Sequence, residues 1–372
     1  MTLQTKRHFF FIFWMLLASF LFQTPSVMAQ NEAKTPLRTG AERMEQYLQL
    51  LEGRRVGLVI NQTSVVHDAS RQHFVALPDT LLRRQIDVRC IMAPEHGYKG
   101  TAEAGAHIQN GRDEETGLTI YSLYGKDKKP RKEWMDEVDV LIFDIQDVGC
   151  RFYTYLSTLY YVMQACAEND KPLIVLDRPN PKDTIDGPML RPGFESFVGI
   201  VPVPILHGCT LGEMAQMIDG ERWCPYPTPT SRLKLTIITC EGWQHGEPYS
   251  LPIAPSKNLC NDHAIALYPS LCLFEGSEVS VGRGTDHPFE MFGNHDLRQA
   301  TAPRGFGLDF YLQYQREKGW GWITRAKFFN MLAGSDELYS QLKKGWSEQR
   351  IRASWQEDLT KYRAKREKYQ LY

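Results

Sequence analysis

The stretch IDVRCIMAPEHGYKG, residues 86–100, runs from an apolar segment directly into a carboxylate and an imidazole. Residues 88–92 predict a buried strand, and Pro94 ends it because proline has no amide hydrogen to give to a neighbouring strand. Glu95 and His96 therefore follow the carboxyl end of a strand, the edge where open α/β sheets bind their ligands. A single glutamate at such a place can equally be a helix cap or an ion-pair partner. A binding site is therefore indicated only if other strands also end in polar residues at this edge.

Three more apolar runs end in polar residues in the same way. The runs RRVGLVINQTS, DVLIFDIQDVG and KPLIVLDRPNP begin at residues 54, 139 and 171. Near-continuous Val, Ile and Leu without polar alternation is typical of parallel strands that are covered on both faces. One Asp alone is well explained as the cap of the next helix, whereas four polar ends on one sheet edge favour a cleft. The polar residues that follow these runs are Asn61, Asp144, Gln146, Asp177 and Arg178.

The third of these four strands continues into an aromatic cluster and a helix. Arg151, Tyr153 and Tyr155 follow it, and apolar residues on one face then predict a helix as far as Asn169. The alternation of strand, helix and strand up to Asp177 predicts a doubly wound, Rossmann-like α/β domain with a parallel sheet. A G-x-G-x-x-G turn is absent from the sequence, so no dinucleotide is implied, and we expect no cofactor.

Residues 1–29 have the pattern of a secretory signal: Lys6 and Arg7, an apolar core, and a small-residue cleavage site before Gln30. We therefore expect export to the periplasm or the medium, with no stable membrane anchor after cleavage; an uncleaved anchor is the alternative. Without Lys6 and Arg7 the 43 basic residues become 41, against 44 acidic residues. This balance gives no indication of a nucleic acid or an anionic membrane as partner.

The remaining chain, residues 30–372, is too long for one small core. We expect two subdomains in contact: a Rossmann-like catalytic domain at residues 30–222 and a smaller α+β auxiliary domain at residues 223–372, whose end is helical. The eight cysteines form no C-x-x-C pair. Buried thiols are therefore the expected state, and we expect no metal site.

Beyond Asp177 the sequence becomes rich in proline and then in long polar loops. Prolines recur between residues 178 and 210, and a stiff extended segment of this kind suits the wall of a cleft. This segment contains His207. Two later stretches, residues 254–259 and 273–290, are polar loops longer than simple connections, and such loops are more often functional than not. They contribute Ser256, Asn258, Arg283 and Thr285.

Several motifs of the chain resemble one known family. In order, the chain carries PEHG at 94–97, FDIQDVGCRFYTY at 143–155, LDRPNP at 176–181, PSKNL at 255–259 and FEGSEVSVGRGTDHPFE at 274–290. These motifs resemble the NamZ-type exo-β-N-acetylmuramidases, glycoside hydrolase family 171. The resemblance implies an exported enzyme with a Rossmann-like domain, an auxiliary domain and a cleft between them. It also implies removal of a terminal non-reducing N-acetylmuramic acid from peptidoglycan fragments.

The resemblance carries catalytic roles onto single residues. The glutamate of PEHG falls on Glu95 as the acid/base, with His96 beside it. Glycoside hydrolysis generally uses a second group as base or nucleophile, and we expect that group among Asp144 and Asp177.

The resemblance also implies a sugar site built from the strand ends and loops. The lactyl carboxylate of the sugar calls for a cation or amide donors, and Arg151, Arg178 and Arg283 are the candidates. Arg283 is the weakest of the three because a surface ion pair explains it equally well. The other residues implied to line the site are Asn61, Gln146, Tyr153, Tyr155, His207, Ser256, Asn258 and Thr285.

Two departures from the family pattern change these expectations. Leu206 stands where family members carry an arginine, which removes a cation next to His207. After GNHD at residues 293–296 a stretch of the auxiliary domain is missing, and the chain moves almost directly to residues 305–307 and the terminal helices. We therefore expect a truncated auxiliary domain.

Two other functions remain open. A muropeptide-binding protein would keep the cleft without turnover, and release of free N-acetylmuramic acid from a disaccharide separates it from an enzyme. A metal-dependent hydrolase would use His96, Asp144, Asp177 and His207, although the sequence has no H-x-H or H-E-x-x-H pattern. For the enzyme and the binding protein alike, the expected partners are muropeptides or disaccharides derived from peptidoglycan.

Overall fold

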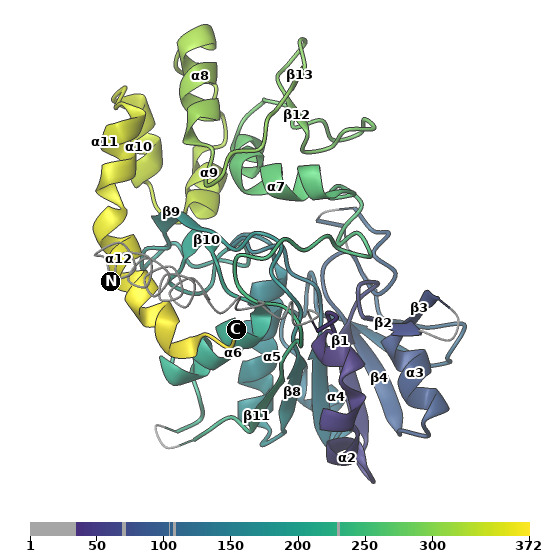
Figure 1. The fold of residues 1–372 in the computed structure, drawn as a ribbon. Coiled ribbons are helices and arrows are strands. Elements are labelled where there is room, and N and C mark those ends of the chain that lie inside the picture. The colour runs from purple at the N-terminus through teal and green to yellow at the C-terminus, as the bar shows by residue number, and fades with distance from the viewer. Residues whose placement is uncertain (1–34, 69–71, 104, 107–108, 229–230) are drawn as a thin grey trace, which may run out of the picture. The chain divides into compact units, whose positions relative to one another are not determined.

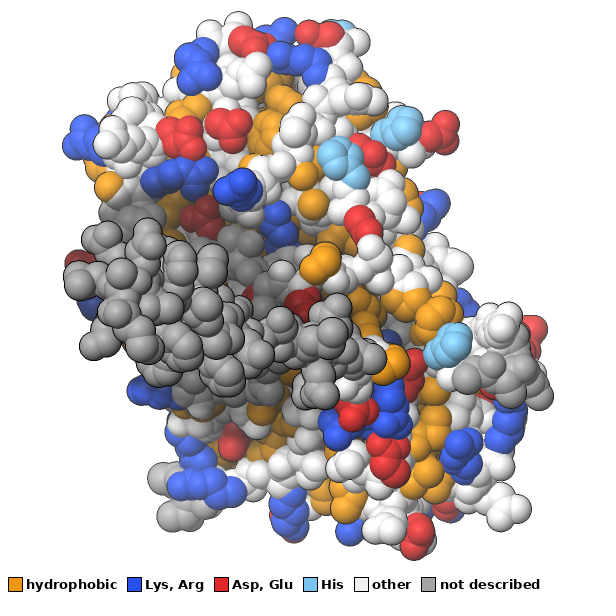
Figure 2. Space-filling model, in the orientation of Figure 1, with side chains coloured by type: hydrophobic (Ala, Val, Ile, Leu, Met, Phe, Trp, Pro, Cys, Tyr) orange, Lys and Arg blue, Asp and Glu red, His pale blue; other side chains and the backbone are white. Residues whose placement is uncertain are grey.

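The computed structural model describes residues 35–68, 72–103, 105–106, 109–228 and 231–372. Residues 36–372 form one compact unit (Figure 1). The expected signal sequence and Gln30 lie outside the described residues. None of the described helices is both long and apolar enough to cross a membrane. On the face drawn in Figure 2, acidic and basic side chains are interspersed over the described surface.

A seven-stranded sheet lies at the centre of this unit. The four strands predicted from apolar runs are among its members, and three of them are buried along their whole length. All neighbouring strands pair in parallel except the last two, so the expected α/β fold with a mainly parallel sheet is confirmed. In spatial order the strands are β11 (Leu235–Ile238), β8 (Leu173–Leu176), β7 (Val140–Asp144), β1 (Val56–Ile60), β4 (Val88–Ala93), β6 (Thr119–Ser122) and β5 (Gly111–Arg112).

Alternate residues of the strands face two separate hydrophobic cores. In β1, Val59 belongs to one core, whereas Leu58 and Ile60 belong to the other. Helices therefore cover both faces of the sheet, as a doubly wound fold requires. The first core includes side chains of α4 (Lys132–Asp136), α5 (Tyr155–Glu168) and α6 (Leu211–Gly220). The second includes side chains of the turn η1 (Gly40–Glu42) and of α2 (Leu48–Leu51) and α3 (Leu77–Arg83), with the turn η2 (Met44–Gln46) beside them.

The sheet grows in opposite directions on the two sides of β1. β4 pairs with one edge of β1 and β7 with the other, where Ile60 lies opposite Asp144. A crevice opens at the carboxyl edge of parallel strands where the strand order reverses in this way. The polar residues that follow β1, β4 and β7 lie at this edge.

The described chain between β1 and β11 forms two antiparallel hairpins beside the sheet. The proline-rich segment predicted as an extended wall forms one of them, in which Pro204 lies opposite Met189 and His207 opposite Ile185. The strands of this hairpin are β9 (Ile185–Met189) and β10 (Pro204–His207). The other hairpin consists of β2 (Val65–Asp68) and β3 (His73–Ala76).

The chain after residue 262 is mostly helical. Its apolar side chains join the same core as those of α5 and α6. The expected domain boundary at residue 222 precedes β11, which is a strand of the central sheet. The C-terminal elements are α7 (Asp262–Leu271), η3 (Cys272–Gly276), β12 (Met291–Phe292), β13 (Arg298–Gln299), α8 (Leu308–Lys318), α9 (Ala326–Ala333), α10 (Glu337–Lys343), α11 (Glu348–Ser354), α12 (Gln356–Arg366) and η4 (Glu367–Tyr369).

Candidate active site

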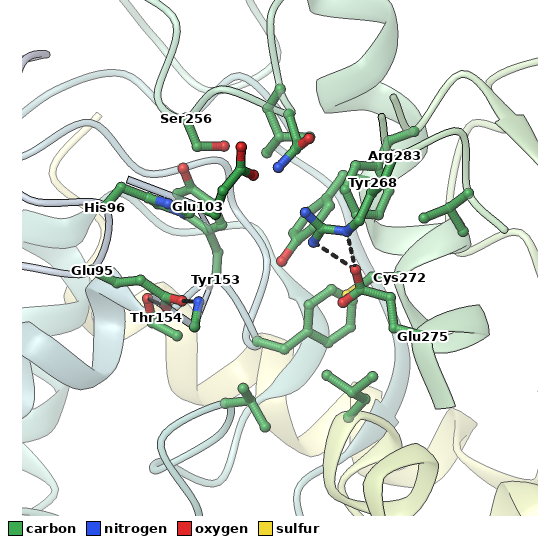
Figure 3. A pocket seen from close by; sticks show the side chains of 18 of the residues that line it. Glu95, His96, Glu103, Tyr153, Thr154, Ser256, Tyr268, Cys272, Glu275 and Arg283 are labelled. Carbon is green, nitrogen blue, oxygen red and sulfur yellow. Dashed lines mark hydrogen bonds and ion pairs between the residues drawn. The ribbon is translucent and has the colours of Figure 1, made fainter. Parts of the chain in front are cut away.

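A cavity of about 840 Å³ lies between the carboxyl edge of the sheet and the C-terminal helical region. One side of its wall comes from residues that follow β4 and β7, and the other from α7, η3 and the loop after η3 (Figure 3). Its volume falls in the range of roughly 300–1,000 Å³ that small-molecule sites occupy. Polar side chains on its wall include Glu95, His96, Glu103, Tyr124, Tyr153, Thr154, Ser256, Asn258, Glu275 and Arg283.

Glu95 is held by donors from three other segments. The Thr154 hydroxyl donates to Oε2 over 2.7 Å, and the Gly105 amide donates to Oε1 over 2.9 Å. The Tyr124 hydroxyl also hydrogen-bonds to Glu95, and burial together with this carboxylate raises the pKa of Tyr124, so the phenol keeps its proton. Figure 3 shows Glu95 beside Thr154 on the cavity wall. These contacts orient the Glu95 carboxyl group at the wall.

Thr154 departs from the usual behaviour of a residue at a helix start. It is the N-cap of α5, where a threonine hydroxyl normally accepts a hydrogen bond from an amide of the first turn. Its hydroxyl caps no such amide here and is directed to Glu95 instead. The Thr154 hydroxyl thus binds the candidate acid and does not stabilise the start of the helix as a cap.

His96 lies next to Glu95 in a tight turn. Its φ of +70° is in the left-handed region, which residues with a Cβ rarely adopt, and Gly97 follows with a φ of +75°. The Gly97 amide donates to the Pro94 carbonyl over 3.0 Å and closes the turn. The ring nitrogen Nδ1 lies 2.9 Å from the Ala102 carbonyl oxygen, which fixes the ring on the cavity wall.

The opposite wall carries a cation and one further carboxylate, Glu275, while another carboxylate, Glu103, lies near His96 (Figure 3). Arg283 Nε donates to Glu275 over 2.6 Å, and the guanidinium lies 4.9 Å from the centroid of the Phe289 ring. Burial lowers the pKa of Arg283, but the negative charge of Glu275 outweighs it, so the net pKa is raised and the guanidinium stays charged. Glu103 pairs with Lys257. Arg283, the weakest of the three arginine candidates by sequence, is thus the one that faces the cavity.

Arg151 and Arg178, which were expected to contact the sugar, are not among the residues that line this cavity. Arg151 is fully buried and donates to the carbonyls of residues 188, 203 and 332. Arg178 forms a buried, bidentate pair with Asp144, at 2.6 and 2.9 Å. Both guanidinium groups therefore bind other groups of the protein. The guanidinium of Arg178 pairs with Asp144, one of the two carboxylates expected to be catalytic.

Asp177 is also directed away from the cavity. It accepts hydrogen bonds from the Thr210 hydroxyl at 2.6 Å, the Tyr372 hydroxyl at 2.7 Å and the Gly212 amide at 2.8 Å. Burial raises the pKa of Asp177 to about 6, against the lowering effect of these bonds. The structure therefore does not bring Asp144 or Asp177 to the cavity, and Glu103 and Glu275 are the carboxylates that accompany Glu95 there.

The other residues expected at the sugar site divide into two groups. Tyr153, Ser256 and Asn258 line the cavity. The second group lies outside the lining and makes contacts within the protein. In this group the Tyr155 hydroxyl donates to the Pro255 carbonyl at 3.0 Å. The remaining members are Asn61, which binds Thr63, Gln146, which binds the Pro179 carbonyl, His207, which lies 3.5 Å from Asp147, and Thr285, which binds the Gly282 carbonyl.

The sequence reasoning missed Thr154, Tyr124, Glu103 and Glu275. Three of them stand inside or beside recognisable signals: Thr154 in RFYTY, Tyr124 at the end of a strand, and Glu275 in FEG. A threonine before a helix is most simply explained as a cap, and a glutamate in a long loop as surface charge. Only the packing of distant segments shows that these side chains face one cavity.

The four residues of the alternative metal site are engaged separately. Asp144 binds Arg178, Asp177 binds Thr210, His207 is buried next to Asp147, and His96 contacts the Ala102 carbonyl. Within the described ranges, no group of three or more His, Cys, Asp or Glu side chains is arranged to hold a metal ion.

Comparisons with known proteins agree on one family. The N-terminal sequence model of the exo-β-N-acetylmuramidase NamZ family matches residues 56–263, and the C-terminal model matches residues 266–309 and 306–372. The peptidoglycan β-N-acetylmuramidase NamZ of Bacillus subtilis (strain 168) is 39% identical over 278 residues, which is 73% of this chain and 64% of that protein. The chain thus spans less than two thirds of the length of this relative.

Two solved structures share the fold. Both are DUF1343 family proteins of Bacteroides fragilis, with a TM-score of 0.79 in each case. One is 35% identical and covers 91% of this chain and 99% of its own. The other is 28% identical and covers 90% of this chain and 99% of its own. By the match of its sequence along most of its length, the chain belongs to the NamZ family of exo-β-N-acetylmuramidases.

Proposed function

We propose that this protein is an exo-acting glycosidase that removes the terminal non-reducing N-acetylmuramic acid from peptidoglycan fragments. Membership of the NamZ family supports the reaction, and the B. subtilis relative is named for it. The observation that carries the proposal is the placement of Glu95, a carboxyl group with three donors on the wall of a sugar-sized cavity.

In this proposal Glu95 is the general acid. It gives its proton to the oxygen that links N-acetylmuramic acid to the next sugar, and the C–O bond to the leaving sugar breaks. The carboxylate that remains is stabilised by the donors that surround it, the Thr154 hydroxyl, the Gly105 amide and the Tyr124 hydroxyl. The same carboxylate can later accept a proton from the attacking water, which restores the acid.

Glycoside hydrolysis of this type uses a second group besides the acid. Glu103 and Glu275 are the other carboxylates on the cavity wall. Each is paired with a cation, Lys257 and Arg283 respectively, and the hydrogen bond from Lys257 lowers the pKa of Glu103. We assign the second role to one of these two groups.

The terminal sugar is distinguished by its lactyl carboxylate, which needs a cation. Arg283 bonds to Glu275 through Nε and Nη2, and within the described residues its Nη1 makes no hydrogen bond. That nitrogen is available to a carboxylate in the cavity. The Ser256 hydroxyl and the Asn258 amide, which also line the cavity, suit the hydroxyl and acetamido groups of the sugar.

The direct test is incubation with the disaccharide of N-acetylmuramic acid β-linked to N-acetylglucosamine. The proposal expects release of both free sugars from the intact chain. A protein that binds the disaccharide and releases nothing would be a muropeptide-binding protein, and the enzymatic proposal would be wrong.

We also propose that the protein is exported. The basic pair, the apolar core and the cleavage pattern within residues 1–29 support this, and the pattern predicts a mature N-terminus at Gln30. Mass spectrometry of the N-terminal peptide from the native host provides the test. A peptide that retains Met1, or the whole apolar core, would contradict cleavage at this site.

A further inference from the structure

Three side chains on the cavity wall continue outward from Glu95, beginning with its donor Tyr124. The Tyr124 hydroxyl contacts Glu95, and the Tyr124 ring centroid lies 5.7 Å from that of Phe197. The Lys128 ammonium lies 5.0 Å from the Phe197 ring centroid. All three line the cavity, and together they form what we call the outer strip.

Phe197 is a rigid member of this strip. The Ser196 and Gly199 amides and carbonyls pair in an antiparallel bridge, which makes a tight turn that carries Phe197. Tyr161 of α5 stacks against the ring, with centroids 6.3 Å apart and an interplanar angle of 17°. A half-buried ring held in this way presents a fixed apolar surface. The C–H-bearing face of a sugar ring packs well against such a surface.

Within the described part of the chain, Lys128 is a cation without an acidic partner. Two nearby basic residues of the same segment are paired, Lys129 with Glu168 at 2.7 Å and Arg131 with Asp127 at 2.5 Å. No acidic side chain among the described residues forms an ion pair with Lys128, whose contact is the Phe197 ring. The strip therefore runs from an acid, through two aromatic rings, to an unpaired positive charge.

We propose that the outer strip binds the leaving part of the substrate: Tyr124 and Phe197 hold the first leaving sugar, and Lys128 binds a carboxylate on the unit that follows. The inference rests on the proposed function, because it takes Glu95 as the acid. The acid must touch the oxygen of the leaving sugar, and Tyr124 is in contact with Glu95. The leaving sugar therefore begins at Tyr124.

The chemistry of the leaving chain matches this order of groups. Its first unit is an uncharged N-acetylglucosamine, which suits aromatic rings. Its next unit is N-acetylmuramic acid, which carries a carboxylate either on its lactyl group or, when the lactyl group is amidated, on the stem peptide. The strip predicts that longer, anionic fragments are better substrates than the bare disaccharide.

Binding of the leaving part can be measured apart from catalysis. Calorimetric titration uses the disaccharide N-acetylglucosamine–N-acetylmuramic acid, its lactyl amide, and the same disaccharide with a stem peptide. Lys128→Met should weaken binding of the free acid by up to about fivefold, the effect of one exposed ion pair, and should remove the difference between acid and amide. Phe197→Ala should weaken binding of acid and amide alike by about three- to tenfold. Lys126→Met, a nearby exposed lysine outside the cavity lining, is the matched control and should bind as wild type.

The outcomes distinguish failure of the outer strip as a binding site from failure of the proposed glycosidase function. If Lys128→Met weakens binding of the stem-peptide form alone, Lys128 binds a carboxylate of the peptide. If Lys128→Met weakens binding of the free acid, Lys128 binds the lactyl carboxylate. Equal binding of acid, amide and peptide forms by wild type and Lys128→Met would overturn the inference, even in a protein that releases N-acetylmuramic acid. Lys128-dependent binding without any release would leave the inference in place and overturn the enzymatic function instead.

Discussion

Single residues from distant parts of the chain decide the properties of Glu95. Its two best-defined donors stand 10 and 59 positions away, in the loop after β4 and at the start of α5. The sheet brings these segments together because β4 and β7 both lie next to β1. Glu95 is therefore positioned by the topology of the sheet and not by its own turn alone.

Thr154→Val tests this positioning. Valine keeps the shape of threonine but removes the hydroxyl that donates to Glu95. Because a hydrogen bond to a charged group contributes roughly 1.5–3 kcal/mol, we expect a loss of about tenfold or more in kcat, with the protein still folded. Steady-state kinetics on the disaccharide measure it. Ser157→Ala, which changes a buried hydroxyl of α5 outside the cavity lining, is the control, and an equal loss in both variants would contradict a specific role for Thr154.

The buried pair of Arg178 and Asp144 makes a second prediction at this scale. Arg178→Met leaves Asp144 ionisable and unpaired in the interior, and we expect a loss of roughly 3–5 kcal/mol in the free energy of unfolding. Asp144→Val together with Arg178→Met removes both charges and should recover most of that loss. Denaturant unfolding of the single and double variants measures both values. A double variant as unstable as the single one would show that the pair is not the cause.

The place of a residue in the fold could be predicted where the neighbouring sequence marks the end of a strand. Glu95 and His96 follow an apolar run and Pro94, so their place at a strand end could be inferred from sequence. The partners of Arg151 are main-chain carbonyls at residues 188, 203 and 332. Any residue type has a carbonyl, so no sequence pattern reveals that this arginine is structural.

At the level of elements, helix α12 is attached to the sheet domain through a partly buried histidine. His245, in the loop after β11, lies 2.9 Å from Asp183 and 2.7 Å from Glu213 of α6. Arg366 of α12 bonds to Asp183 and contacts the His245 ring. Burial lowers the pKa of His245, but the two carboxylates outweigh it and raise the pKa to about 9.

This cluster predicts a pH dependence of stability. Since the pKa of His245 is above its ordinary value of 6.5, the stabilisation is fully present below pH 6.5 and is lost as the pH rises through about 9. We expect the free energy of unfolding to fall between these pH values. His245→Gln should be less stable than wild type at pH 6.5 and should lack this part of the slope. Denaturant titrations across the range measure it, and identical slopes in both proteins would refute the assignment.

Strands that are marked by a continuous run of apolar residues in the sequence were predicted correctly. The strands β1, β4, β7 and β8 follow from apolar runs, because strands covered on both faces need no polar alternation. The β9–β10 hairpin was not predicted as such. Its segment is rich in proline, which disfavours regular pairing in general, and its pairing depends on residues about twenty positions apart.

At the scale of the molecule, the N-terminal and C-terminal regions are joined by specific bonds. Arg151 donates to the Leu332 carbonyl at 2.9 Å, the Tyr362 hydroxyl to the His207 carbonyl at 2.8 Å, and the hydroxyl of Tyr372 to Asp177 at 2.7 Å. We therefore expect residues 36–372 to unfold in one cooperative transition, with coincident loss of far-UV circular dichroism and tryptophan fluorescence. Two separated transitions would show that the regions are independent.

The central claim is that Glu95 is the general acid, and one substitution tests it most directly. Glu95→Gln keeps the size and the hydrogen-bonding shape of the side chain but cannot give a proton. We predict a loss of roughly 10²–10⁴ in kcat on the disaccharide, with substrate affinity little changed. Normal turnover by Glu95→Gln, combined with an inactive Glu103→Gln or Glu275→Gln, would contradict the account and assign the acid to one of the other carboxylates of the cavity.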